Sequence, residues 1–72
     1  MQTLTFNTTT KEVKLLEGQR NSSSILESFF NVSTVKYEDG FYQVMQKTSE
    51  ESNSSLPVMR VPISNTNMII ER

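Results

Sequence analysis

Cysteine and histidine are both absent from the 72 residues. The chain therefore forms no disulfide and offers zinc neither thiolate nor imidazole. Histidine is also the commonest general acid or base. The two glycines are too few for a loop that cradles phosphate, and Asp39, the single aspartate, fits a turn. Ser22–Ser24 has no histidine or lysine base to activate a hydroxyl. We therefore expect a protein that is not an enzyme and that holds no cofactor and no metal.

The charge is nearly balanced, with seven basic and eight acidic residues and a net charge of -1. Duplex DNA rewards many basic contacts, so we expect no binding to it. No stretch approaches the roughly 20 apolar residues that cross a membrane. The first ten residues, MQTLTFNTTT, also lack the pattern of a signal peptide. We expect a cytoplasmic protein without a membrane partner.

The small size limits how much stability the chain can gain by itself. A chain below roughly 70–80 residues rarely obtains more than about 3–5 kcal/mol from one core. Disulfides are ruled out here, and only 35% of the residues are hydrophobic. We expect residues 1–72 to form a single small domain that assembles as a homo-oligomer.

Two hairpins stand out. In residues 3–16, Leu4 and Phe6 alternate with polar residues, and Val13 and Leu15 do the same, which predicts two paired strands. In VKYEDGFYQV, residues 35–44, Asp39-Gly40 suits a two-residue type I′ turn. That turn pairs each residue before it with one after it. It predicts a core face formed by the following residues: Val35, Tyr37, Tyr42 and Val44.

The remaining segments are less regular. Ser24 and Glu27 have capping-box spacing before a helical stripe that ends at Phe30, so the pattern favours a short helix, with a strand as the alternative. Residues 48–56 are predicted to be a flexible loop. Pro62 belongs on an edge strand or at a bulge. A turn at Asn65-Thr66 would place Arg60 opposite Glu71.

These elements predict a mostly β fold, which would be a small α+β domain if the short helix forms. The hairpins would form a compact antiparallel sheet or barrel with at most one short helix.

The outer face of the second hairpin carries two unexpected apolar residues, Phe41 and Met45. Exposed apolar patches of this kind commonly mark a site that binds a partner protein or a ligand. We expect these two residues to be core or a contact surface, with the contact surface as our hypothesis. If the ligand is a small nucleotide, Lys36, Arg60 and Arg20 could meet its phosphates. Tyr37 or Phe41 could then stack on its base.

Part of the chain resembles the Sm-like family of RNA-binding rings. VKLLEGQ is similar to that family's first strand and turn, ILESFFNV to its second strand, and VMRVPI and MII to its last two. The chain departs from the family at Ser23, where a second glycine is expected. It also lacks an Asp near Phe29 and an Arg-Gly after Met59. The resemblance implies binding of single-stranded nucleic acid.

The sequence as a whole favours a non-enzymatic interaction protein. We expect a homo-oligomeric inhibitor or sponge, of the class that bacteriophages and mobile elements encode against host defence. Its target would be a host protein or a small signalling nucleotide. The alternatives are an Sm-like or other single-stranded nucleic-acid-binding module, or a structural subunit of a larger assembly.

Overall fold

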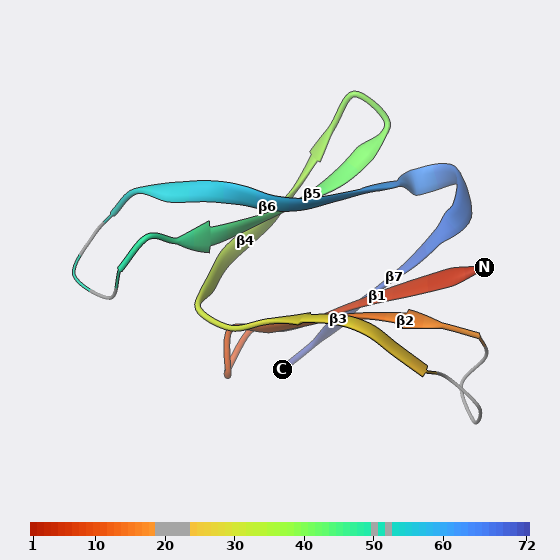
Figure 1. The fold of residues 1–72 in the computed structure, drawn as a ribbon, viewed down its shortest axis with the longest axis horizontal. Coiled ribbons are helices and arrows are strands. Elements are labelled where there is room, and N and C mark those ends of the chain that lie inside the picture. The colour runs from red at the N-terminus through yellow and green to blue at the C-terminus, as the bar shows by residue number, and fades with distance from the viewer. Residues whose placement is uncertain (19–23, 50, 52) are drawn as a thin grey trace.

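Seven strands in the described residues form two sheets that face each other (Figure 1). The computed structural model describes residues 1–18, 24–49, 51 and 53–72. The elements follow one another as β1 (Gln2–Asn7), β2 (Glu12–Glu17), β3 (Ser24–Phe29), β4 (Val32–Glu38), β5 (Phe41–Lys47), β6 (Ser55–Pro62), a 3-10 turn η1 (Ile63–Asn65) and β7 (Thr66–Glu71). The predicted mostly β class is confirmed.

The chain moves from one sheet to the other and back again. The four-stranded sheet has the order β3-β2-β1-β7, and the three-stranded sheet has the order β4-β5-β6. Neighbours in each sheet are antiparallel except β1 and β7, which run parallel. The four-stranded sheet is therefore mixed, where the sequence predicted antiparallel pairing throughout.

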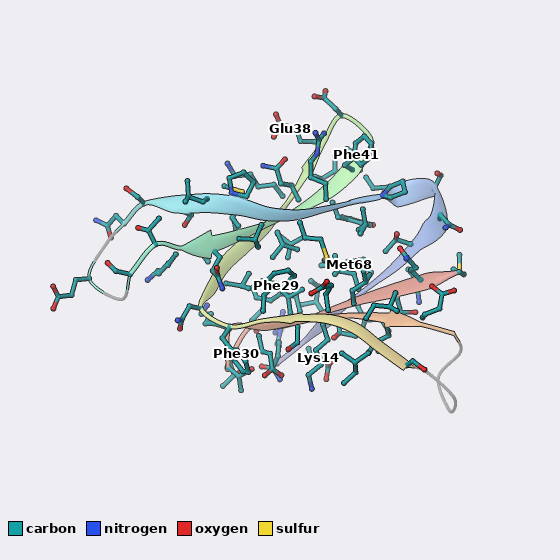
Figure 2. All side chains as sticks on the ribbon, in the orientation of Figure 1. Lys14, Phe29, Phe30, Glu38, Phe41 and Met68 are labelled. Atoms are coloured by element: carbon teal, nitrogen blue, oxygen red, sulfur yellow. The ribbon has the colours of Figure 1, made fainter. Side chains whose placement is uncertain are left out.

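The core lies between the two sheets. Leu4 and Val13 from one sheet and Val44 from the other are completely buried. Phe29 and Met68 point into the same space and pack against this cluster, whereas Phe30 and Lys14 point away from it (Figure 2). Within the described residues the buried cluster consists of Leu4, Phe6, Val13, Leu15, Val32, Val44 and Val61. The alternation read in residues 3–16 predicted four of these.

The helix favoured at residues 24–30 is wrong and the alternative is correct, because Ser24–Phe29 form strand β3. Leu16 pairs with Ile25 and Leu15 pairs with Glu27, so Leu26 is an extra residue at a β-bulge. A bulge interrupts the two-residue alternation of a strand. The apolar residues on either side of it then acquire a spacing that imitates a helical stripe.

The second hairpin has the predicted register. Glu38 pairs with Phe41 and Tyr37 pairs with Tyr42. Asp39 and Gly40 have φ values of 52° and 81°, the two positive values that a type I′ turn needs. The predicted core face is correct for Val44, but Tyr37 is 74% exposed. The hairpin tip extends past β6 and away from the four-stranded sheet, which leaves Tyr37 uncovered (Figure 1).

The predicted turn at Asn65-Thr66 is also wrong. Residues 63–65 form the 3-10 turn, which carries the chain into the other sheet. Arg60 consequently lies opposite Gln43 in β5, and Glu71 lies beside Asn7 in β1. Pro62 does lie in an edge strand, as predicted, because β6 borders the three-stranded sheet.

Part of the predicted loop at residues 48–56 is a strand, since β6 already begins at Ser55. Residues 50 and 52 fall outside the described residues, and the loop's flexibility stays a prediction. In the part of the chain that the structure describes, no helix has the length and apolar character to cross a bilayer.

Candidate functional site

The two edges of the four-stranded sheet expose large apolar side chains. On β3, Ile25 is 61% and Leu26 is 46% exposed. On β7, Ile69 is 37% and Ile70 is 53% exposed. On β7 the pairing is regular, so the side chains of Ile69 and Ile70 lie on opposite faces and the exposure belongs to the edge itself. On β3 the two exposed residues lie at the bulge. An open edge also presents unpaired backbone groups, which makes it a template for another strand.

The outer face of the three-stranded sheet carries Phe41, and another side chain already covers its ring. The Arg60 guanidinium lies over the Phe41 ring, with its Cζ 4.4 Å from the ring centroid. The ring is partly buried. Stacking of a cation on an aromatic ring contributes about 0.5–1 kcal/mol at an exposed site. A polar side chain thus covers one face of the predicted contact residue.

Met45 lies on the same face and is buried, with 8% of its surface exposed. The Gln43 amide Nε2 approaches the Met45 sulfur at 3.4 Å, two residues away along β5. Ser33 Oγ donates a hydrogen bond to the Met45 carbonyl oxygen at 3.2 Å. Met45 is therefore already surrounded in a single chain. Its role in binding a partner stays a prediction.

The basic residues predicted to meet phosphates are only partly assembled. Lys36 pairs with Gln43, which pairs with Arg60, so the three form one row across the outer face. Arg20 lies outside the described residues. Phe41 belongs to the face of this row, whereas Tyr37 belongs to the opposite face. The two aromatic residues proposed to stack a base therefore cannot act together within one subunit.

Tyr37 is the most exposed aromatic side chain described, and it contacts a second ring. Its ring meets that of Tyr42 edge to face, with centroids 6.4 Å apart and planes at 81°. Such pairs contribute about 0.5–1.5 kcal/mol beyond the area that they bury. The contact orients Tyr37 at the tip of the hairpin, where a partner could reach it.

A separate hollow of about 350 Å³ lies where the β1–β2 turn, the corner between β3 and β4 and the end of β5 meet. It is lined by Thr10, Lys11, Asn31, Val32, Ser33 and Lys47. The sequence offered no motif for this group, because its members come from three separate segments. Each of these short segments contributes at most one lysine to the hollow, so the pairing of Lys11 with Lys47 becomes apparent only in the folded chain.

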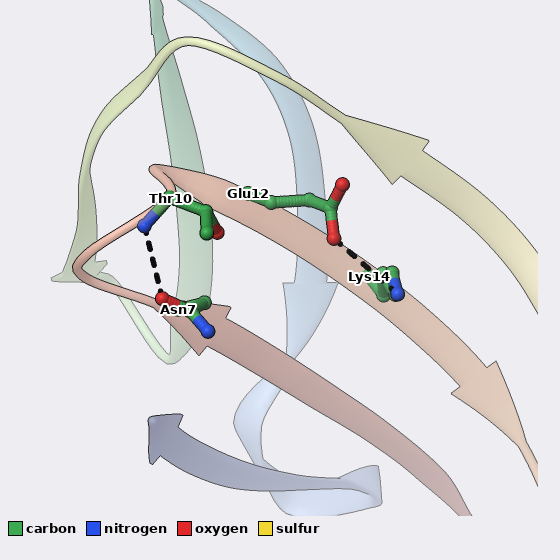
Figure 3. Close-up of polar contacts among 4 residues, drawn as sticks. All are labelled: Asn7, Thr10, Glu12 and Lys14. Atoms are coloured by element: carbon green, nitrogen blue, oxygen red, sulfur yellow. Dashed lines mark hydrogen bonds and ion pairs between the residues drawn. The ribbon is translucent and has the colours of Figure 1, made fainter. Parts of the chain in front are cut away.

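In the described part of the chain, no three acidic side chains lie close enough together to hold a metal ion. The ion pair that the structure shows joins Lys14 Nζ to Glu12 Oε1 at 3.3 Å, on the outer side of β2 (Figure 3).

Comparison with known proteins returned no match to a family model, to a curated protein or to a solved structure.

Proposed function

We propose that this chain is a non-enzymatic binding protein that works as a homo-oligomer, with β3 of one subunit pairing with β7 of the next. The observation that carries the proposal is the exposure of consecutive apolar residues on both of these edges, Ile25 and Leu26 on one and Ile69 and Ile70 on the other. Natural proteins usually protect sheet edges with charged residues or proline. On β7 the positions from Thr66 to Ile70 carry neither, and on β3 the one charged residue is Glu27.

The small core gives a reason for assembly. The described chain exposes 4968 Å², and a standard interface of roughly 800 Å² per partner would cover about one sixth of this surface. Apolar area removed from water contributes about 25 cal/mol per Å². Burying the two edges would therefore add stability that a subunit of this size lacks.

Pairing of unlike edges is favoured over pairing of like edges. If β3 paired with itself about a two-fold axis, Glu27 near the centre of the strand would approach its own copy. Like charges placed opposite each other destabilise a sheet. Pairing β3 with β7 avoids this contact and joins the four-stranded sheets of successive subunits. Such head-to-tail contacts form a closed ring when the rotation between subunits permits.

The exposed row of Lys36 and Arg60 would then be repeated around the assembly, and we assign this row to the bound target, a host protein or a small nucleotide. Tyr37 lies on the opposite face of the hairpin, so it would join the same site only from a neighbouring subunit. Inhibition or sequestration needs no chemistry beyond binding, which agrees with a sequence that contains no histidine and no cysteine. A role against host defence is part of the same proposal.

Two variants that block different edges test the arrangement. Ile25→Lys places a charge on the β3 edge, and Ile70→Lys places one on the β7 edge. Each variant alone should be monomeric by sedimentation velocity. An equimolar mixture retains one intact edge of each kind, so it should form a heterodimer of about twice the 8.3 kDa chain mass.

The control is Asn67→Lys, which adds the same charge at an exposed position of β7 that is already polar. It should retain much more assembly than Ile70→Lys. If Ile25→Lys still self-associates like the wild type, β3 is not part of the contact. A mixture that stays monomeric would also contradict pairing of β3 with β7.

A further inference from the structure

The hollow beside Lys11 and Lys47 has the composition of an anion site. Three segments meet there: the β1–β2 turn, the corner between β3 and β4, and the end of β5. Its described lining includes two lysines and no carboxylate, although acidic residues outnumber basic ones in the whole chain. Neither lysine makes an ion pair within the described part of the chain. Both side chains are exposed and free to turn toward a ligand.

Backbone hydrogen bonds hold the three segments together. The Val32 amide donates to the Lys11 carbonyl oxygen at 2.9 Å, and the Lys47 amide donates to the Asn31 carbonyl oxygen at 2.9 Å. Gln46 Nε2 adds a bond to the Phe30 carbonyl oxygen at 2.7 Å. The positions of the two lysine backbones are therefore fixed relative to each other, and only their side chains need to be ordered by a ligand.

The β1–β2 turn is shaped by one side chain. Asn7 Oδ1 accepts hydrogen bonds from the Thr9 and Thr10 amides at 3.0 Å each; Figure 3 shows the bond to Thr10. This cap places Lys11 at the end of the turn, with a left-handed φ of 60°. The neighbouring carboxylate of Glu12 is engaged by Lys14. The one acidic neighbour of Lys11 in sequence is therefore paired with another lysine.

We propose that this hollow binds the phosphate group of a small phosphorylated molecule. A phosphate monoester carries close to two negative charges at neutral pH and has several acceptor oxygens. Two lysines match this charge, whereas a single lysine would neutralise only half of it. The Thr10 hydroxyl and the Asn31 amide add uncharged groups that can donate hydrogen bonds. The hollow exceeds the size of a phosphate and falls in the range of small-molecule sites, roughly 300–1,000 Å³.

This site goes beyond the proposed assembly and does not depend on it, because one chain supplies every lining residue. It also differs from the row of Lys36 and Arg60, which lies on the outer face of the three-stranded sheet. Loss of self-association would therefore leave phosphate binding intact. Loss of phosphate binding would equally leave the edge strands able to pair.

The test is a titration of ¹⁵N-labelled protein, with ionic strength held constant by sodium chloride. The probes are inorganic pyrophosphate and adenosine monophosphate. Saturable shifts are expected at the amides of Lys11, Asn31, Val32 and Lys47. Tighter binding of pyrophosphate would indicate a phosphate chain as the ligand, and tighter binding of the nucleotide would indicate a phosphate joined to an organic group.

Two variants remove the charges without disturbing the backbone. Lys11→Asn suits the left-handed conformation, which asparagine adopts more readily than most residues. Lys47→Gln keeps the length of the stem nearly unchanged. Each should weaken binding by about fivefold or more, as expected for the loss of one charged hydrogen bond. Ser64→Glu lowers the net charge by the same amount at an exposed position of the 3-10 turn, outside the hollow, and should leave the affinity unchanged.

The proposal is overturned if neither probe gives saturable shifts in the wild type. It is also overturned if Ser64→Glu weakens binding as much as Lys47→Gln, because attraction would then depend on net charge alone. Thermal melting of each variant shows that the fold is retained, so a loss of binding can be attributed to the missing charge.

Discussion

Replacing Leu4 by alanine should remove most of the stability of an isolated subunit. Leu4 is completely buried on β1, between Leu15 on β2 and Met68 on β7. Truncating a buried leucine to alanine costs about 2–5 kcal/mol, because transfer energy is lost and a cavity remains. A single core in a chain of this size supplies only about 3–5 kcal/mol. The cost of the substitution is thus similar to the whole stability of the subunit, so Leu4→Ala should be close to unfolded whenever it is monomeric.

The measurement is urea unfolding followed by circular dichroism at two protein concentrations, with Leu56→Ala as the control. Leu56 is 59% exposed on β6, so its truncation should cost less than about 1 kcal/mol. Leu4→Ala should gain folded signal as the concentration rises, because assembly stabilises the folded state by mass action. A Leu4→Ala variant within about 1 kcal/mol of the wild type would refute this account of the core.

Three further substitutions test particular features. Thr66 is 6% exposed and its hydroxyl has no hydrogen-bond partner in the described structure, so Thr66→Val should raise stability by about 1 kcal/mol in thermal unfolding. Gly40 has a φ of 81°, and an added Cβ would meet nothing within 4 Å, so Gly40→Ala should destabilise through backbone strain alone, by about 1 kcal/mol. Phe41→Ser should keep the strand signal in circular dichroism and lose less than the roughly 3–5 kcal/mol of a fully buried Phe; complete unfolding would show that Phe41 is core.

Local signals in the sequence predicted the two hairpins well. Asp39-Gly40 fixes its own turn and, through it, the register of β4 against β5. The alternation around Leu4 and Val13 marks the buried face. Both signals depend on residues close together in the chain, where turn chemistry and burial act directly.

Long-range pairing was harder to predict. β7 joins β1 in a parallel pair, although 64 positions separate Gln2 from its partner Thr66. No turn determines such a contact, and the nearby Asn65-Thr66 pair suggested a hairpin instead. The bulge at Leu26 likewise made a strand resemble a helix.

The candidate sites show the same difference between local patterns, which the sequence reveals, and long-range contacts, which it does not. Lys36 and Phe41 could be placed on one face from the hairpin pattern, whereas Arg60 was expected opposite Glu71 and joins that face through the pairing of β6 with β5. Lys11 and Lys47 could not be grouped, because their proximity depends on the corner after β3 and its hydrogen bonds to both segments. A site built from separate turns leaves no spacing to recognise in the sequence.

The central claim is that subunits of this protein assemble through the apolar edges of the four-stranded sheet. Light scattering of the purified wild-type protein at low micromolar concentration tests it most directly. The expected mass is a whole-number multiple, two or more, of the 8.3 kDa chain. A mass of one chain, combined with a single cooperative unfolding transition that does not change with concentration, would contradict the claim.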